Sequence, residues 1–293
     1  MLNIILNSTN LMNERRYSTI FGLTNENMHG LEPILNDLKY DDSTYLGIAG
    51  SGELALKVME TGCKNLTLFD INTNAIAYCI LIFKLIECPE ITYEEFIDFL
   101  GFNNTLTTKE SVITRTDKRI TTYNKIAPYL PPEVKELWDI QYSIKKDETH
   151  PISLVRNERV KSIKHPMLEK DTFYKLREIF SQNDLTIKFI LSSFEELPGH
   201  ISNGNHFNII YLSNIYDWIT NHEMFWQVVK TFREMSDIII TRVGIYGIIS
   251  GALIEDLQKI FEIPPAYTTE ATDDMTIYEV MPKTFKKIEK SHN

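Results

Sequence analysis

Two glycines and an aspartate have the types and the spacing that a nucleotide-like ligand requires. Gly50 and Gly52 stand in the stretch GIAGSGE, where a short apolar segment meets a helical pattern. A backbone without Cβ atoms lets a ligand approach closely at such a turn. Asp70 follows 18 residues after Gly52, at the end of the apolar segment NLTLFD, where a carboxylate can accept hydrogen bonds from both ribose hydroxyls. The spacing indicates an adenosine-containing ligand, although the glycine pair alone is equally typical of a tight turn that binds nothing.

The residues around the glycine pair distinguish between ligands with and without phosphate. The stretch does not match GxGxxG because residue 55 is alanine. Glu53, at the start of the following helix, would repel a diphosphate. S-adenosylmethionine carries a sulfonium and an ammonium and no phosphate, so it tolerates this acid better. We therefore predict S-adenosyl-L-methionine as the cofactor.

Polar and aromatic residues follow two later apolar segments. Ser193 and Phe194 come after the segment TIKFIL, where folds of this kind present a polar group and a ring to an adenine. Ser213 and Asn214 come after FNIIYL, beyond the end of the next strand. For the rings of Phe194 and Trp218, packing in the core is an equally good explanation. The predicted cofactor-binding residues are Ala49, Gly50, Ser51, Gly52, Asp70, Ile71, Asn72, Ser193, Phe194, Ser213, Asn214 and Arg242.

The elements that must position these residues alternate between strand and helix. This order predicts an α/β fold with a Rossmann-like parallel sheet of the class I methyltransferase type. We expect an N-terminal helical lid over residues 1–40 and a cofactor-binding domain over 41–293, with a helical insertion at about 91–180. The expected strands are Tyr45–Ala49, Asn65–Asp70, Thr186–Leu191, Phe207–Leu212 and Asp237–Thr241, with an antiparallel edge strand at Tyr278–Met281.

Composition excludes several classes of function. The chain has 293 residues and a formal charge of −10, which argues against a nucleic-acid partner because phosphate binding draws on Lys and Arg. The three cysteines and seven histidines show no metal-ligand spacing, so no metal is predicted. No apolar run reaches the ~18 residues of a transmembrane helix, and the N-terminus lacks the pattern of a secretory signal. We expect a cytoplasmic protein.

Longer phrases of the sequence resemble one family of enzymes. These phrases are GIAGSGELAL, LTLFDIN, ITYEEFIDFLGF and YNKIAPYLPPEVKELWD. Together they are similar to the S-adenosylmethionine:diacylglycerol 3-amino-3-carboxypropyltransferases of betaine-lipid synthesis and their uncharacterised relatives. The resemblance covers most of the chain. Its most specific parts are Asp70 with Asn72, the ending Phe99-Leu100-Gly101, and the pair Trp138-Asp139.

The resemblance implies transfer of the 3-amino-3-carboxypropyl group to a hydroxyl or amine. It places Tyr17 and Glu26 in a segment that covers the active site, and Arg242 after the fifth strand. Arg242 could bind the carboxylate of the methionine arm through its planar fork. Glu26, Asp217 and Tyr17 are the candidate catalytic residues, as general bases that take the acceptor's proton. For Glu26 and Asp217, helix capping is an equally common role.

Three readings of the function stay open at this stage. An aminocarboxypropyltransferase and an ordinary methyltransferase would share the fold and the cofactor, whereas a non-catalytic protein would bind the cofactor only. The acceptor is a small molecule or a lipid. The basic C-terminal stretch KTFKKIEKSHN allows contact with an anionic membrane surface, although a solvated tail explains it equally well.

Overall fold

The structure is a computed structural model. It describes residues 3–6, 19–21, 35, 43–101, 116–142, 153–155, 169–182, 184–201, 204–213, 215, 218–242, 261–262 and 282–287.

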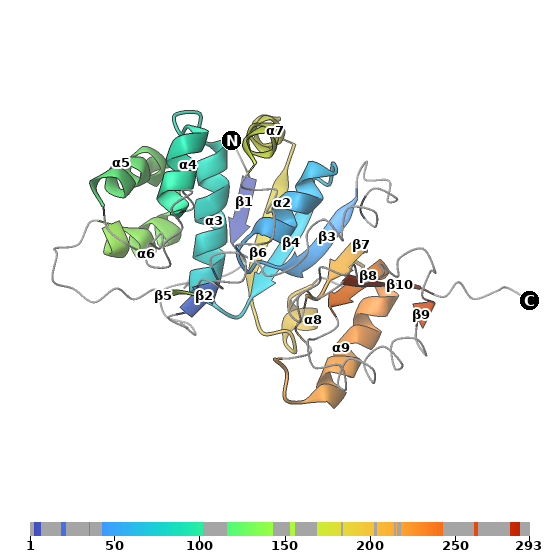
Figure 1. The fold of residues 1–293 in the computed structure, drawn as a ribbon. Helices are drawn as coiled ribbons and strands as arrows, with labels where there is room; N and C mark the ends of the chain where they lie inside the picture. Colours follow the sequence, from blue (N-terminus) through green and yellow to red (C-terminus); the bar gives the residue numbers. More distant parts are fainter. Residues whose placement is uncertain are drawn as a thin grey trace, which may run out of the picture.

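An eight-stranded sheet forms the centre of the fold, in the order β1-β6-β4-β3-β7-β8-β10-β9 (Figure 1). The strands from β1 to β8 run parallel, and β10 runs antiparallel to both β8 and β9. Strand β3 lies in the middle of the sheet. Strands β4 and β6 follow on one side of it, and β7 and β8 follow on the other side. This doubly wound order confirms the predicted Rossmann-like fold. The bounds are β1 Asn3–Leu6, β3 Thr44–Ile48, β4 Asn65–Asp70, β6 Thr186–Leu191, β7 Phe207–Tyr211, β8 Ser236–Arg242, β9 Phe261–Glu262 and β10 Pro282–Lys287.

Helices cover both faces of this sheet (Figure 1). Side chains alternate along a strand, so Tyr45 and Leu46 of β3 point to opposite faces and join two separate apolar clusters. The first cluster packs α2, α3 and α7 on one face, and the second packs α8 and α9 on the other. The bounds are α2 Glu53–Glu60, α3 Thr73–Glu87, α7 Lys170–Ser181, α8 Leu197–His200 and α9 His222–Glu234.

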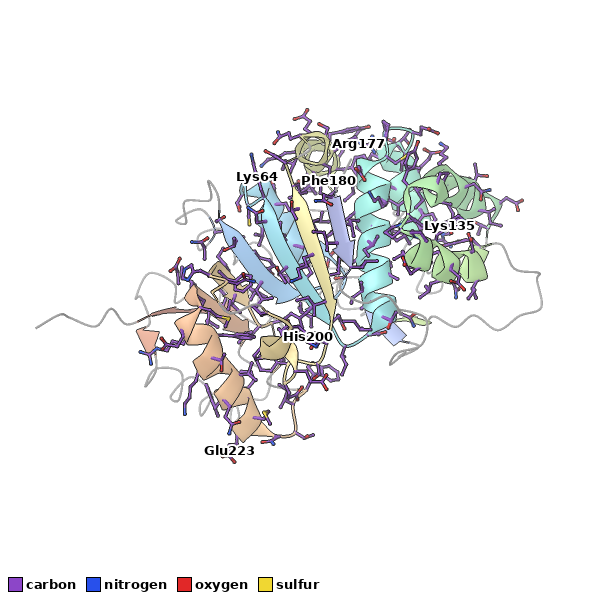
Figure 2. All side chains as sticks on the ribbon, turned by 180° about the vertical axis from the view of Figure 1, so that it is seen from behind. Lys64, Lys135, Arg177, Phe180, His200 and Glu223 are labelled. Carbon is purple, nitrogen blue, oxygen red and sulfur yellow. The ribbon has the colours of Figure 1, made fainter. Side chains whose placement is uncertain are left out.

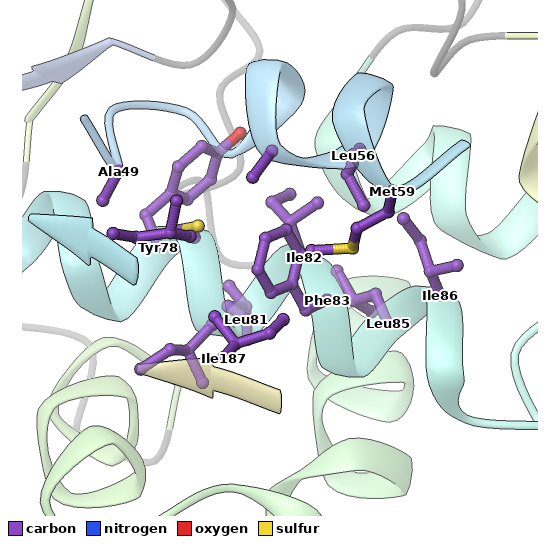
Figure 3. Close-up of a cluster of buried hydrophobic side chains, with 14 of the residues drawn as sticks. Ala49, Leu56, Met59, Tyr78, Leu81, Ile82, Phe83, Leu85, Ile86 and Ile187 are labelled. Atoms are coloured by element: carbon purple, nitrogen blue, oxygen red, sulfur yellow. The ribbon is translucent and has the colours of Figure 1, made fainter. Parts of the chain in front are cut away.

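Helix α3 is buried along almost its whole length. Its sequence is apolar on every side, which is typical of a helix with neighbours all round. Figure 3 shows Ile82 and Phe83 of α3 facing Leu56 and Met59 of α2. The helix starts at Asn72, whose side chain accepts a hydrogen bond of 3.0 Å from the Asn74 N–H. The cap fixes the start of α3 directly after β4.

The predicted helical insertion is present in the described residues between α3 and α7. It contains α4 (Tyr93–Leu100), α5 (Asp117–Ile126), the 3₁₀ turn η2 (Ala127–Tyr129) and α6 (Pro132–Tyr142). Thr92 and Glu95 form a reciprocal capping box at the start of α4. One short strand, β5 (Ser153–Val155), interrupts the helical character. Among the described helices, none combines the length and the apolar composition needed to cross a bilayer.

The N-terminal segment differs from the prediction of a helical lid. Residues 3–6 form β1, which pairs in parallel with β6 at the edge of the main sheet. Residues Thr19–Phe21 form β2, which pairs in parallel with β5. The helical prediction is therefore wrong for both stretches. The sequence NIIL is rich in β-branched residues, but its partner strand lies about 180 residues away in the chain, so the local pattern did not reveal the pairing.

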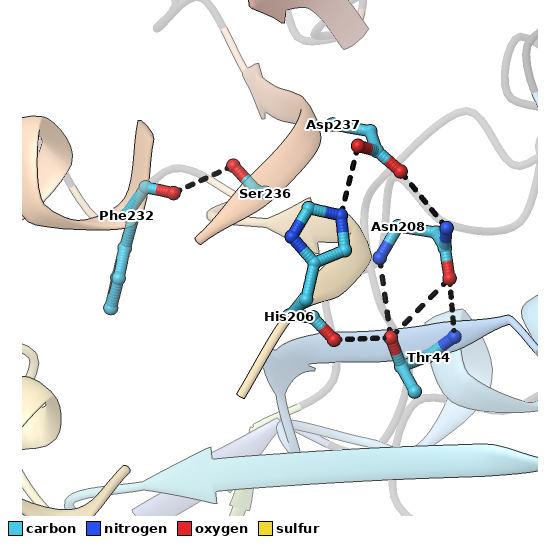
Figure 4. Close-up of polar contacts among 6 residues, drawn as sticks. All are labelled: Thr44, His206, Asn208, Phe232, Ser236 and Asp237. Carbon is cyan, nitrogen blue, oxygen red and sulfur yellow. Dashed lines mark hydrogen bonds and ion pairs between the residues drawn. The ribbon is translucent and has the colours of Figure 1, made fainter. Parts of the chain in front are cut away.

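A polar network connects the amino ends of three central strands (Figure 4). The Asn208 side chain accepts a 2.9 Å hydrogen bond from the Thr44 N–H and donates one of 2.9 Å to Asp237. His206 Nε2 lies 2.9 Å from the other carboxylate oxygen of Asp237. These contacts tie the amino ends of β3, β7 and β8 together. They hold the strands in register, so that the carboxyl ends meet at one edge.

Candidate cofactor and active site

Four loops meet where the central parallel strands end. Residues Ile48 and Phe69 are partners in adjacent strands, as are Asp70 and Leu191, so the loops after β3, β4 and β6 start side by side. The loop after β7 lies on the other side of β3. Figure 2 shows the two ends of the central strands, with Lys64 before β4 at one end and His200 of α8 at the other. The chain reverses direction across the sheet between β3 and β7, and ligands of doubly wound folds bind at this switch point.

Asp70 links the first two loops. Its carboxylate accepts a 3.1 Å hydrogen bond from the Gly50 N–H through Oδ2 and one of 2.9 Å from the Asn72 N–H through Oδ1. The backbone of Ile71 donates a further hydrogen bond. The residue as a whole is 8% exposed, so little of its surface is open to solvent. Each carboxylate oxygen can accept more than one hydrogen bond. The carboxylate can therefore accept hydrogen bonds from a diol in addition to those from the backbone.

Burial sets the protonation of this carboxyl. Desolvation disfavours the charged form and raises the pKa of Asp70 to about 6, although the hydrogen bonds from Asn72, Gly50 and Ile71 oppose the shift. The carboxyl is consequently ionised at neutral pH and protonated in mildly acidic solution. A buried acid with a raised pKa, at a strand end and at the switch point, is typical of a functional site.

The two glycines after β3 have different structural roles. Gly50 has a φ of 46°, and a Cβ built on it would meet no atom within 4 Å. Gly52 has a φ of 85°, and its Cβ would lie 3.1 Å from Cys79 Sγ and 3.2 Å from Phe83 Cε1 in α3. A side chain at position 52 would therefore point into the core against α3, which explains the glycine by packing, and the predicted role of Gly52 in cofactor binding stays a prediction. Gly50 is the residue that borders open space and touches Asp70.

Alanine substitutions should separate these roles. Gly50→Ala is expected to cost about 1 kcal/mol of stability through left-handed strain alone. Gly52→Ala should cost about 2 kcal/mol because the new methyl group also crowds Cys79 and Phe83. Urea unfolding measures both. Adding Cys79→Ala to Gly52→Ala should recover part of the loss but should not improve Gly50→Ala. Equal losses for both single variants would contradict the assignment.

Glu53 and Ser51 complete the loop after β3. Glu53 is 3% exposed and accepts a 3.2 Å hydrogen bond from the Ser51 hydroxyl. The Ala49 N–H donates to the Phe69 carbonyl at 2.7 Å, and the Gly52 N–H donates back to the Ala49 carbonyl at 2.8 Å. These bonds define a tight turn that runs directly into α2. The buried acid at the start of α2 makes this helix end a poor phosphate site.

The loop after β6 contains one predicted residue in the expected place and one that belongs to the core. The Ser193 hydroxyl donates a 3.1 Å hydrogen bond to Glu196, at the edge beside Asp70. The ring of Phe194 is 5% exposed and stacks on Phe225 with 5.3 Å between centroids. It also meets Phe232 edge-on at 5.7 Å. The core-packing alternative therefore accounts for Phe194.

In the loop after β7 the aromatic residue is exposed, in contrast to the buried Phe194. Ser213 is buried and has a φ of 50°, a left-handed conformation that is strained for a residue other than glycine. Trp218 is 70% exposed, so the core-packing alternative for this residue is wrong. Its backbone N–H donates a 2.9 Å hydrogen bond to the carbonyl of the buried Ile215, which anchors the turn. The sequence gives no signal that separates an exposed tryptophan from a buried one here.

Comparisons with known proteins give similarities of fold at very low sequence identity. The N-methyltransferase NodS from Bradyrhizobium japonicum WM9 aligns over 90% of this chain and 94% of its own, at 10% identity and a TM-score of 0.42. A Streptococcus mutans protein described as a methyltransferase, in complex with SAH, aligns over 91% and 100% at 8% identity and a TM-score of 0.42. An rRNA methylase from Streptococcus thermophilus aligns over 90% and 98%, at 8% identity and a TM-score of 0.42. No protein-family model and no curated protein matches the sequence. At these TM-scores the similarities add nothing to the assignment of the site.

Four predicted site residues lie outside the described part of the chain, and a fifth is described in its backbone alone. Tyr17, Glu26, Asn214 and Asp217 lie outside the described residues, and only the backbone of Arg242 is described, as the last residue of β8. Within the described ranges, no group of three or more His, Cys, Asp or Glu side chains is arranged to hold a metal ion. The described site therefore consists of the loops after β3, β4, β6 and β7, centred on Asp70.

Proposed function

We propose that the chain is an S-adenosylmethionine-dependent transferase. The observation that carries this proposal is the buried carboxylate of Asp70 at the end of β4, joined to the Gly50 N–H at the end of β3. This pair supplies what an adenosine ligand needs, an acceptor for two ribose hydroxyls beside a backbone that a ligand can approach closely. The buried Glu53 favours a ligand without phosphate. S-adenosylmethionine meets both conditions.

In this proposal the described residues bind and orient the cofactor. Asp70 accepts hydrogen bonds from the ribose, while Gly50 and Ala49 allow close approach. Ile71 and Asn72 lie at the start of α3 beside the adenosine, and Ser193 offers its hydroxyl to the adenine edge. Ser213 in the loop after β7, together with Asn214, which lies outside the described residues, would contact the reactive end. The exposed Trp218 stands on this loop as a surface for the acceptor.

The sulfonium of the cofactor makes three attached carbons susceptible to attack, so the protein selects the reaction by positioning the acceptor. The family resemblance favours attack at the γ-carbon and transfer of the 3-amino-3-carboxypropyl group. Arg242 would then bind the carboxylate of the arm through its fork, and Glu26, Asp217 or Tyr17 would take the proton from a hydroxyl or amine of a small-molecule or lipid acceptor. Methyl transfer is the alternative reaction at the same cofactor site.

The domain arrangement belongs to the same proposal. The part of residues 1–40 that follows β1 would cover the site as a lid on the cofactor domain 41–293, whereas β1 itself is a strand of the main sheet. Strand β2 supports this placement because it lies beside the N-terminal part of α3, near the carboxyl edge of the sheet (Figure 1). The pairing of β2 with β5 joins the lid segment to the helical insertion.

Analysis of the released product tests the reaction. Turnover with labelled S-adenosylmethionine and candidate acceptors should release methylthioadenosine if the γ-carbon reacts. Release of S-adenosylhomocysteine would replace this subtype by methyl transfer and leave the cofactor assignment standing. Calorimetry with the cofactor alone is the separate test of binding, and a protein that binds without turnover would be a non-catalytic binding protein.

Cofactor affinity should depend on pH through Asp70. Because the pKa of this carboxyl is raised to about 6, it is protonated at pH 5 and can no longer accept both ribose hydrogen bonds. The affinity for S-adenosylmethionine should therefore be roughly tenfold lower at pH 5 than at pH 7.5, and level above pH 7. Titration calorimetry at four pH values measures this curve. In Asp70→Asn the step between pH 5 and 7 should disappear, and a step that persists would assign it to another group.

A further inference from the structure

Trp218 is the most exposed large apolar side chain in the described part of the chain. It is 70% exposed, whereas the next three, Ile5, Tyr174 and Tyr129, are 41%, 40% and 39% exposed. A tryptophan ring in water leaves a large apolar area without the stabilisation that burial would give. Single exposed rings are common on protein surfaces, so the place of this ring in the fold decides whether it has a function.

The sheet register places the loop of Trp218 at the proposed cofactor site. Leu68 of β4 and Tyr211 of β7 share one partner residue in β3, which lies between them. Two residues further along their strands, Asp70 and Ser213 therefore stand at the same level, two strands apart. Because neighbouring strands are about 4.8 Å apart, the two backbones are separated by roughly 10 Å. Trp218 follows Ser213 by five residues, so its ring belongs to the same edge of the sheet as Asp70.

Hydrogen bonds and buried anchors hold the turn that carries Trp218. The Ile215 N–H donates to the Leu212 carbonyl at 3.2 Å. The backbone N–H groups of Trp218 and Ile219 both donate to the Ile215 carbonyl, at 2.9 and 3.2 Å. Ile215 is buried in the second apolar cluster, and Ile219 packs against that cluster. The left-handed φ of 50° at Ser213 adds backbone strain of the kind that gathers at ligand sites. The turn therefore presents the indole to solvent before any ligand binds.

The charges at this edge of the sheet disfavour a negatively charged acceptor. We consider the loops after β3, β4, β6 and β7, each with the first turn of the helix that follows it. Among their described side chains there is no Lys or Arg, and the ionisable ones are Glu53, Asp70, Glu195, Glu196, His200 and Glu223. Figure 2 shows Glu223 and His200 at this end of the molecule. A field from acids repels an anion and tolerates a neutral or cationic molecule.

We propose that Trp218 binds the acceptor by stacking on a flat aromatic ring that carries no negative charge. This inference rests on the proposed function and names the class of acceptor for the same site. An indole face packs well against a second planar ring, and it also attracts positive charge. An acyl chain would instead need several apolar side chains in a row, whereas Thr220 and Asn221, which follow Trp218 closely, are polar and exposed.

Benzylamine is a suitable probe because it combines one flat ring with a positive charge. Titration calorimetry with S-adenosylmethionine present at saturation should show saturable binding of benzylamine. This binding should be about three- to tenfold weaker in Trp218→Leu and nearly unchanged in Trp218→Phe, which keeps a ring. Cyclohexylmethylamine has the same charge without the flat ring, and benzoate has the ring with a negative charge. Both should bind at least threefold more weakly than benzylamine to the unmodified protein.

Tyr174→Leu is the matched control and should leave the affinity for benzylamine unchanged. Tyr174 is 40% exposed and lies on α7. Figure 2 shows Arg177 and Phe180 of this helix at the end of the molecule opposite to His200. Trp218→Leu should fold normally, since the side chain that it replaces is largely in solvent.

The outcomes separate this inference from the proposed function. Absence of saturable benzylamine binding to the unmodified protein would overturn the inference, as would equal affinity of Trp218→Leu or equal affinity for cyclohexylmethylamine. Equal affinity for benzoate would overturn the assignment of charge. S-adenosylmethionine alone should bind equally to Trp218→Leu and the unmodified protein. If the unmodified protein does not bind S-adenosylmethionine, the proposed function fails and this inference fails with it. Loss of the benzylamine result with cofactor binding intact would remove this inference alone.

Discussion

Replacement of Asp70 by alanine is expected to weaken binding of S-adenosylmethionine by about 2–4 kcal/mol, a roughly 30- to 1,000-fold loss of affinity. The reason is that, in the proposed function, the carboxylate at the end of β4 accepts hydrogen bonds from two ribose hydroxyls in a largely desolvated setting. The residue is 8% exposed, and its carboxylate already accepts hydrogen bonds from the Gly50 and Asn72 N–H groups. Titration calorimetry measures the loss, and circular dichroism checks that the variant is folded.

A second substitution separates the ribose contact from a collapse of the loop. Asp70→Asn keeps one acceptor oxygen for the backbone and should still lose at least tenfold in affinity. Asp237→Ala is the matched control because this acid lies at the opposite edge of the sheet, in contact with His206 and Asn208. It should bind the cofactor like the unmodified protein. Unchanged affinity in both Asp70 variants would remove this residue from the site and with it the main support for the proposed function.

Asp70 also lowers the stability of the ligand-free protein at neutral pH. Its pKa in the folded state, about 6, lies above the ordinary value of 3.8, so the folded chain holds this proton to higher pH than the unfolded chain. The contribution of Asp70 to stability is therefore present below about pH 4 and is lost as the pH rises through 6. A buried charge that reduces stability at neutral pH is more easily explained by binding than by folding.

The central part of the fold could be predicted from sequence because its signals are local. The strand Asn65–Asp70 and the strand Thr186–Leu191 have the bounds that their apolar runs indicate. The pairing of β1 with β6 was missed because it joins segments far apart in the chain, and NIIL is too short to show a period. The predicted antiparallel strand Tyr278–Met281 lies outside the described residues, and the described antiparallel strand β10 is Pro282–Lys287, which pairs with β8.

The candidate site was predictable in its backbone and less so in the direction of its side chains. Spacing alone places Gly50 and Asp70 at adjacent strand ends, and their hydrogen bond follows from the sheet register. Spacing does not show that Gly52 faces α3, because that depends on how closely Cys79 approaches. Nor does it separate the buried ring of Phe194 from the exposed ring of Trp218, since both follow a strand end and only tertiary packing distinguishes them.

The largest effect on stability is expected from Trp138→Ala, which should cost about 3–5 kcal/mol. Trp138 is 0% exposed, packs on Tyr78 and Tyr142, and donates its indole N–H to the Ala77 carbonyl at 3.1 Å. It joins the insertion to α3, and α3 begins beside Asp70. Trp138→Phe keeps most of the apolar contact and loses the hydrogen bond, so it should cost less, about 1–2 kcal/mol.

Trp218→Ala is the matched control, because a tryptophan that is 70% exposed should change stability by less than about 0.5 kcal/mol. Urea unfolding followed by circular dichroism gives both the midpoint and the slope for each variant. If the insertion and the sheet form one cooperative unit, Trp138→Ala shifts the midpoint and keeps a single transition with the same slope. Two separate transitions would show that the insertion unfolds independently of α3. A shift no larger than that of Trp218→Ala would contradict the role of Trp138 as the residue that holds the insertion against the cofactor domain.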